Sequence, residues 1–171
     1  NKFVKEISNS KYFTSLKVGQ KGTIEGKQYT VVAIVIRKTG RDYKWAEYYL
    51  KDNQLNDAFL SESEGHWVFM KPLSQPFQTT KYGATFNDEN YRKYETTQSS
   101  ISSAFGFFED SLKYGVASYS EYVRGEKIVS YENHGENRVY YLEGRHFSNS
   151  ELKLAFKNLD FIPSKVGYSI V

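Results

Sequence analysis

Hydrophobic and polar residues alternate over short stretches along most of the chain, which is the period of a β-strand. The strongest run covers residues 28–38, where apolar side chains fall on both faces of the expected strand: Tyr29, Val31, Ala33 and Val35 on one, Val32, Ile34 and Ile36 on the other. Such a strand is expected to be central and covered on both sides. Four shorter strands are predicted nearby, at residues 23–25, 45–51, 58–61 and 66–71. Short strands joined by turns, with no helix between them, indicate an antiparallel meander curled into a small barrel.

The second half of the chain predicts another set of strands. Residues 91–101 and 104–108 form two of them, and Gly106 in the second indicates a bulge or the close approach of another backbone. Three more are expected at residues 119–123, 127–133 and 138–143, and residues 73–89 are expected to be a connection with one strand. The fold class is therefore mainly β, α+β at most: a single unit over residues 1–171 with one or two barrel-like lobes, at 16–74 and 86–147. Whether the two halves are a duplication stays open.

Helical signals are confined to the two ends of the chain. Ser148 and Glu151 fit a capping box, and apolar residues follow at helical spacing, which predicts a helix over about 149–158. Residues 1–15 leave two alternatives, a short amphipathic helix or a tail that docks through Tyr12 and Phe13.

The composition supplies a core and excludes several kinds of chemistry. The 12 Phe, 15 Tyr and 2 Trp can each bury about 150–250 Å². The net charge of +3 comes from mixed signs, unlike the concentrated basic face of a duplex-binding protein. Without cysteine there are no disulfides, iron–sulfur clusters or thiol catalysis. The longest apolar run, residues 31–36, is far shorter than the ~20 residues of a membrane span. We therefore expect a soluble, cytoplasmic protein. Because the chain begins at Asn1 and not at a methionine, the sequence leaves open whether another segment precedes it.

Three short blocks resemble a known family. They are Leu16-x-Val18-Gly19 with its following glycines, Trp45-x-Glu47-Tyr48-x-Leu50, and Leu60-Ser61 followed by Gly65-His66-Trp67. In this order they resemble domain of unknown function 4178, an uncharacterised bacterial family, and the resemblance extends from about Leu16 to Phe156. It implies a β-rich bacterial module and supplies no catalytic residue to carry over.

Polar clusters offer little catalytic chemistry. Glu132, His134 and Glu136 have the spacing of one strand face, which suits a metal or an acid–base pair. Asn and Gly residues lie between them, so a solvated hairpin tip is the preferred interpretation. The same applies to Glu62, Glu64 and His66, and no nucleophile or phosphate-loop motif is present. We predict no catalytic residue, no metal ligand and no cofactor, and an enzyme is the minority hypothesis.

Aromatic residues next to cations are the one pattern with a binding mechanism behind it. They form two stretches, Tyr43-Lys44-Trp45 with Tyr48, and Tyr91-Arg92-Lys93-Tyr94. These rings either form a platform on which a ligand stacks or pack over the sheet without binding a ligand. The leading hypothesis is a non-enzymatic interaction module that binds another protein, with a membrane surface as one location. Trp45, Tyr48 and Trp67 are predicted near the binding face. The alternatives are a single-stranded nucleic-acid-binding barrel and, third, a metal-dependent hydrolase built on Glu132 and His134.

Overall fold

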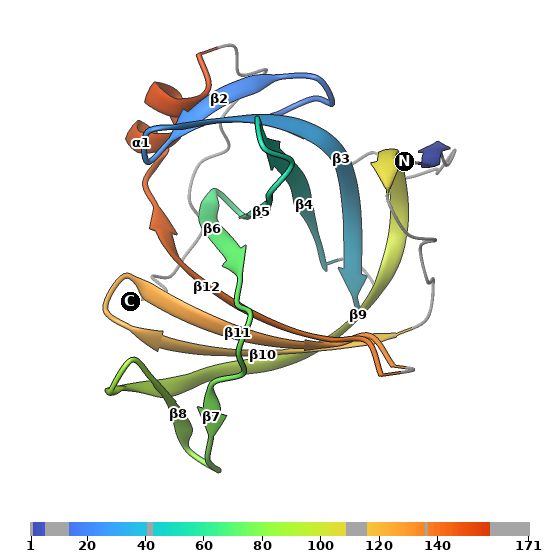
Figure 1. Ribbon diagram of the computed structural model, residues 1–171. Coiled ribbons are helices and arrows are strands. Elements are labelled where there is room, and N and C mark those ends of the chain that lie inside the picture. Colours follow the sequence, from blue (N-terminus) through green and yellow to red (C-terminus); the bar gives the residue numbers. More distant parts are fainter. Residues whose placement is uncertain (1, 6–13, 41–42, 109–115, 136, 158–171) are drawn as a thin grey trace.

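The computed structural model describes residues 2–5, 14–40, 43–108, 116–135 and 137–157 (Figure 1). Its strands are β1 (Lys2–Lys5), β2 (Lys21–Ile24), β3 (Lys27–Thr39), β4 (Tyr43–Asp52), β5 (Asp57–Ser63), β6 (His66–Pro72), β7 (Gln78–Thr79), β8 (Gly83–Phe86), β9 (Glu89–Phe108), β10 (Ala117–Arg124), β11 (Lys127–Asn133) and β12 (Val139–Phe147), and its helix is α1 (Asn149–Ala155). The mainly β prediction with one C-terminal helix is confirmed.

Within the described residues, eight antiparallel strands close into a barrel in the order β3-β4-β5-β6-β12-β11-β10-β9. The closing step is the pairing of β9 with β3, which runs from Ala33 opposite Gly106 to Lys38 opposite Ser100. The first expected lobe supplies β2 to β6 and the second supplies β9 to β12, and one sheet is continuous through both. No described helix is long and apolar enough to cross a membrane.

Strand β9 differs from its prediction, because it is one strand of 20 residues and not two. A break at residues 102–103 was expected, but β9 pairs with β10 over its first part and with β3 over its last part. Ladder bonds on both stretches keep the serine backbone extended, and Ser103 is buried. Gly106 meets the expectation of a close approach: a Cβ there would come 2.5 Å from the Cα of Ala33.

The face of β3–β6 that meets α1 carries the largest core. Ile34, Tyr48, Leu60, Trp67, Phe69, Leu152 and Phe156 belong to this core, which we call the helix-side core. The other face of β3 carries Ala33 and Val35, which pack with Ile101 and Phe108 inside the barrel. The prediction that this strand is covered on both sides is confirmed. The predicted division into faces is wrong in its first part, because a register shift between Val31 and Ala33 leaves Tyr29 and Val31 on the same side as Ile34 and Ile36.

The ends of the chain differ in detail from what the sequence predicted. The capping box of Ser148 and Glu151 is present, but α1 ends at Ala155 because Phe156 turns to an extended conformation. Its ring is buried against Gly22, where a Cβ would come within 2.6 Å of that ring. Residues 2–5 form β1 on β9 and not a helix, while Tyr12, Phe13 and Leu159 lie outside the described residues.

The outer face of β10 and β11 is covered by a small aromatic cluster. Phe77, Tyr91, Tyr122 and Val129 are buried in it. The connection that leads to β9 holds two strands, β7 and β8, where one was expected, and they form a hairpin at the side of the barrel (Figure 1).

Candidate functional site

A cavity of about 520 Å³ lies inside the barrel. One part of its lining is apolar and comes from five strands: Tyr49, Phe59, Val68, Met70, Ile101, Phe108 and Leu142. The other part is polar, with Arg37, Glu47, Glu132 and His134. Phe107 and Tyr140 also line the cavity while 47% and 42% of their surface is exposed, so the cavity reaches the protein surface beside them.

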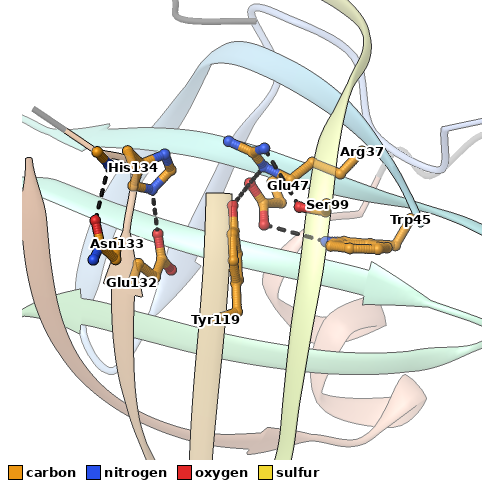
Figure 2. A network of polar contacts seen from close by, with 9 residues as sticks. Arg37, Trp45, Glu47, Ser99, Tyr119, Glu132, Asn133 and His134 are labelled. Atoms are coloured by element: carbon orange, nitrogen blue, oxygen red, sulfur yellow. Dashed lines mark hydrogen bonds and ion pairs between the residues drawn. The ribbon is translucent and has the colours of Figure 1, made fainter. Parts of the chain in front are cut away.

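Alternation along the strands places these side chains inside. On β4, Tyr48 and Leu50 belong to the helix-side core, whereas Glu47 and Tyr49 line the cavity. On β11, Glu132 lines the cavity and Val129 faces the outer aromatic cluster. In Figure 2 the strands that carry Ser99, Tyr119 and Glu132 cross in front of the opposite wall, and the polar side chains lie between the two.

Arg37 and Glu47 form a buried ion pair at the centre of the polar group, with 3.1 Å between Nε and Oε1. The Trp45 indole N–H donates to the second Glu47 oxygen at 3.2 Å, and the Tyr119 hydroxyl donates to the first at 3.5 Å (Figure 2). The Arg37 guanidinium lies 5.2 Å from the centre of the Tyr119 ring. Burial alone would lower the pKa of Arg37, but Glu47 and the surrounding oxygens outweigh it and hold that pKa above its ordinary value. Glu47 therefore stabilises the charge of Arg37 inside the barrel, and the surrounding partners hold both side chains in place.

Glu132 and His134 form a second pair, with 3.1 Å between Oε1 and Nε2. Each side chain is only 15% exposed, so the solvated hairpin tip expected from the sequence is wrong for these two residues. The reason is that barrel closure turns this face of β11 inward. The His134 ring packs between Tyr119 and Tyr140, at centroid distances of 5.9 and 5.4 Å. Burial raises the pKa of Glu132, the charge of Glu47 adds to this, and the His134 hydrogen bond opposes it.

A third inner carboxyl, Glu121, lies on β10 opposite Glu95 of β9. Burial, followed by the charges of Glu95, Glu132 and Glu47, raises the pKa of Glu121 to about 8. Glu121 is therefore largely protonated at neutral pH and adds little negative charge to the inner polar group.

The chain matches the family model Domain of unknown function (DUF4178) over residues 17–149. The protein belongs to this family. The predicted resemblance is confirmed, and the matched range includes every residue of the polar group described above. Comparisons with curated proteins and with solved structures give no match. Membership of DUF4178 names no activity, so the geometry of the cavity is the basis for assigning a function.

The three predicted binding residues of this DUF4178 protein lie on two sides of the β3–β6 wall. Tyr48 and Trp67 are fully buried in the helix-side core, where their rings stack at 5.9 Å. Trp45 is also largely buried, but its indole contacts Glu47, which lines the cavity. Tyr91 of the expected stacking platform is buried in the outer aromatic cluster. A binding role for Trp45, Tyr48 and Trp67 stays a prediction.

Neither acidic triad of the sequence forms a three-residue cluster. Glu62 points into the helix-side core, where Ser15 and Tyr48 donate to its two oxygens, both at 2.5 Å. Glu64 has a positive φ of 51° in the turn after β5. Glu136 lies outside the described residues. Within the described ranges, no group of three or more His, Cys, Asp or Glu side chains could hold a metal.

Arg37 and Tyr119 were missed by sequence reasoning. A signal for Arg37 was available, because it continues the inward series of Ala33 and Val35 and is only 2% exposed. A charge at an apolar position of a central strand needs a buried partner. Its partner Glu47 comes from the adjacent strand, but Tyr119 comes from 82 positions further along the chain (119 minus 37), where no local pattern indicates the contact.

Proposed function

We propose that this protein is a non-enzymatic binding module that takes one small, partly apolar molecule into its barrel. The cavity carries the proposal, since its 520 Å³ lies within the range of about 300–1,000 Å³ typical of ligand sites. Eight-stranded barrels have interiors just wide enough to be filled by side chains or to hold one small ligand.

The composition of the cavity lining supports a ligand that is apolar over most of its surface. Such sites combine hydrophobic and aromatic walls with a few polar groups that orient the ligand. Here the walls include Phe59, Met70 and Leu142. The polar groups are Glu132 and His134, and the Tyr140 ring packs against His134 and fixes its position. The exposed rings of Phe107 and Tyr140 border the opening.

The three functions predicted from the sequence stay hypotheses of different standing. A protein partner is best sought at the opening, where Phe107, Val139 and Tyr140 expose apolar surface. A nucleic-acid platform is less supported, because Tyr91 serves the core. A hydrolase would use Glu132 and His134, which have the geometry of an acid–base pair, but a third ligand for a metal does not join them within the described residues.

Dye binding tests the proposal. We expect N-phenylnaphthylamine, a neutral apolar dye, to bind saturably at one site with a rise in fluorescence. Ser61 lines the cavity between Glu47 and Val68, so Ser61→Phe fills space there and should weaken dye binding at least about tenfold, or 1.4 kcal/mol.

The matched control is Gln98→Phe, which places the same ring on the exposed side of β9 and should leave dye affinity unchanged. Circular dichroism confirms that both variants fold. Unsaturable dye binding, or equal affinity in the Ser61→Phe variant, would show that the cavity is not a ligand site.

A further inference from the structure

The charged side chains that face the cavity differ in how many partners they have. Arg37 forms an ion pair with Glu47, donates to the Ser99 hydroxyl at 3.5 Å and lies over the Tyr119 ring. Lys51 pairs with Asp57 at 2.7 Å. Glu132, in contrast, has His134 as its one side-chain hydrogen-bond partner within the described residues, on one of its two oxygens. A carboxylate offers about four acceptor positions, so Glu132 has capacity for a further donor.

A second buried group on the same strand face has the same unused capacity. Ser130 is fully buried, and its hydroxyl has no hydrogen-bond partner among the described residues. Ser130 lies between Ile128 and Glu132 on the inner face of β11, so it is the inward neighbour of Glu132, which lines the cavity, although Ser130 itself is not among the lining residues. A buried hydroxyl without a hydrogen-bond partner destabilises the folded protein, and a donor on a ligand would remove that cost.

We propose that the cavity is selective for a primary amine with an apolar body, its ammonium group bound by Glu132 and Ser130. This inference rests on the proposed function, because it names the ligand class of the same cavity. An ammonium group has three N–H donors and no acceptor, which matches two groups that have acceptors to offer. The rings of Tyr119 and Tyr140, packed on either side of His134, add faces that attract a cation.

The charges of the cavity lining leave two candidates for a charged ligand. Arg37 pairs with Glu47 and Lys51 pairs with Asp57, which leaves Glu132, with His134 on one of its oxygens, and Arg138. Arg138 at the cavity lining is the group an anionic ligand would use, so an anion is the alternative that the experiment must exclude.

The apolar walls fit the rest of such a ligand. Phe59, Val68, Met70 and Leu142 belong to one cluster that lines the cavity, and they come from three strands, β5, β6 and β12. Each methylene moved from water onto this wall adds to the binding affinity. An alkyl chain or a ring therefore supplies affinity, and the amine supplies selectivity.

Three ligands that share one chain separate charge from hydrophobicity. Octylamine, octanoate and octanol are titrated calorimetrically into the full chain at neutral pH. We expect octylamine to bind at least about tenfold more tightly than the other two. Glu132→Gln should remove at least about tenfold of the octylamine affinity, and the octanol affinity should not change.

Two further variants keep the test specific. Glu126→Gln changes a carboxylate in an exposed turn and should leave octylamine binding unchanged. Ser130→Ala should weaken octylamine a few-fold without affecting octanol, and it serves as the readout if the Glu132 variant does not fold. Octylamine affinity should also rise with pH through the raised pKa of Glu132, because only the ionised carboxyl attracts the ammonium.

The outcomes separate this inference from the proposed function. Equal or tighter binding of octanoate, or unchanged octylamine binding in the Glu132→Gln and Ser130→Ala variants, overturns the amine assignment while the cavity remains a ligand site. The same holds if none of the three octyl compounds binds but the neutral dye does. Failure of the dye as well as all three compounds overturns the proposed function itself.

Discussion

Glu62 and Glu132 lie on opposite sides of the β3–β6 wall, and their carboxyl groups are held differently. Glu62 lies in the helix-side core, where Ser15 and Tyr48 donate to both of its oxygens. Glu132 lies across the barrel from the other face, with His134 on one oxygen and the cavity beside it. Burial raises the pKa of both carboxyls. The difference shows that burial alone does not identify a candidate binding site. Glu62 connects chain segments through hydrogen bonds to both of its oxygens, whereas Glu132 borders the cavity and has a hydrogen-bond partner on one oxygen only.

The largest loss of stability should come from a substitution in the helix-side core. Trp67→Ala removes a fully buried ring from the helix-side core and should cost about 3–5 kcal/mol of unfolding free energy. Phe59→Ala, on the cavity side, should cost only about 1–2 kcal/mol, because its ring already borders empty volume. Urea denaturation measures both. Equal losses would mean that the two faces are packed alike.

The two glutamates themselves give the next effect. Glu62→Gln replaces an acceptor of two hydroxyl donors with an amide and should cost about 1–3 kcal/mol. Glu132→Gln removes a poorly compensated charge and should change the unfolding free energy by less than about 1 kcal/mol. Urea titrations at neutral pH compare them directly, and a larger loss for Glu132→Gln would assign it the structural role.

The smallest effect is pH-dependent and concerns Glu121. Its pKa is about 8 in the folded protein against an ordinary value of 4.5, so folding favours the protonated form. The stability that this group contributes is full below about pH 4.5 and is lost as the pH rises through about 8. Glu121→Gln should therefore be neutral near pH 4 and stabilising by about 1–3 kcal/mol near pH 9.

Thermal unfolding of wild type and Glu121→Gln across this pH range measures the difference. Glu126→Gln, in an exposed turn, should show no such trend. A stabilisation that is constant with pH would contradict the raised pKa of Glu121 in the folded protein.

Much of the fold could be predicted from local patterns. Alternation identified most barrel strands, the two-sided burial of β3 and the capping box of α1, because each of these depends on neighbouring residues. Strand β9 could not be predicted as one element, since its serine-rich middle is a strand only through partners far along the chain. The candidate site was less predictable still: Glu132 and His134 were noticed as a pair but assigned to solvent.

The sequence by itself determined which residues share a face along each regularly alternating stretch of strand, since that follows from a period of two. It did not reveal the register shift between Val31 and Ala33, which places Val31 with Ile34 and Ile36 in the helix-side core. Only the tertiary structure decided what covers each face. An inward polar residue and a solvent-facing one leave the same local pattern, and Arg37, Tyr119 and Glu132 differ from surface residues only because β9 pairs with β3 and closes the barrel. That pairing joins residues more than sixty positions apart, and it turned an ordinary polar strand face into the lining of a cavity.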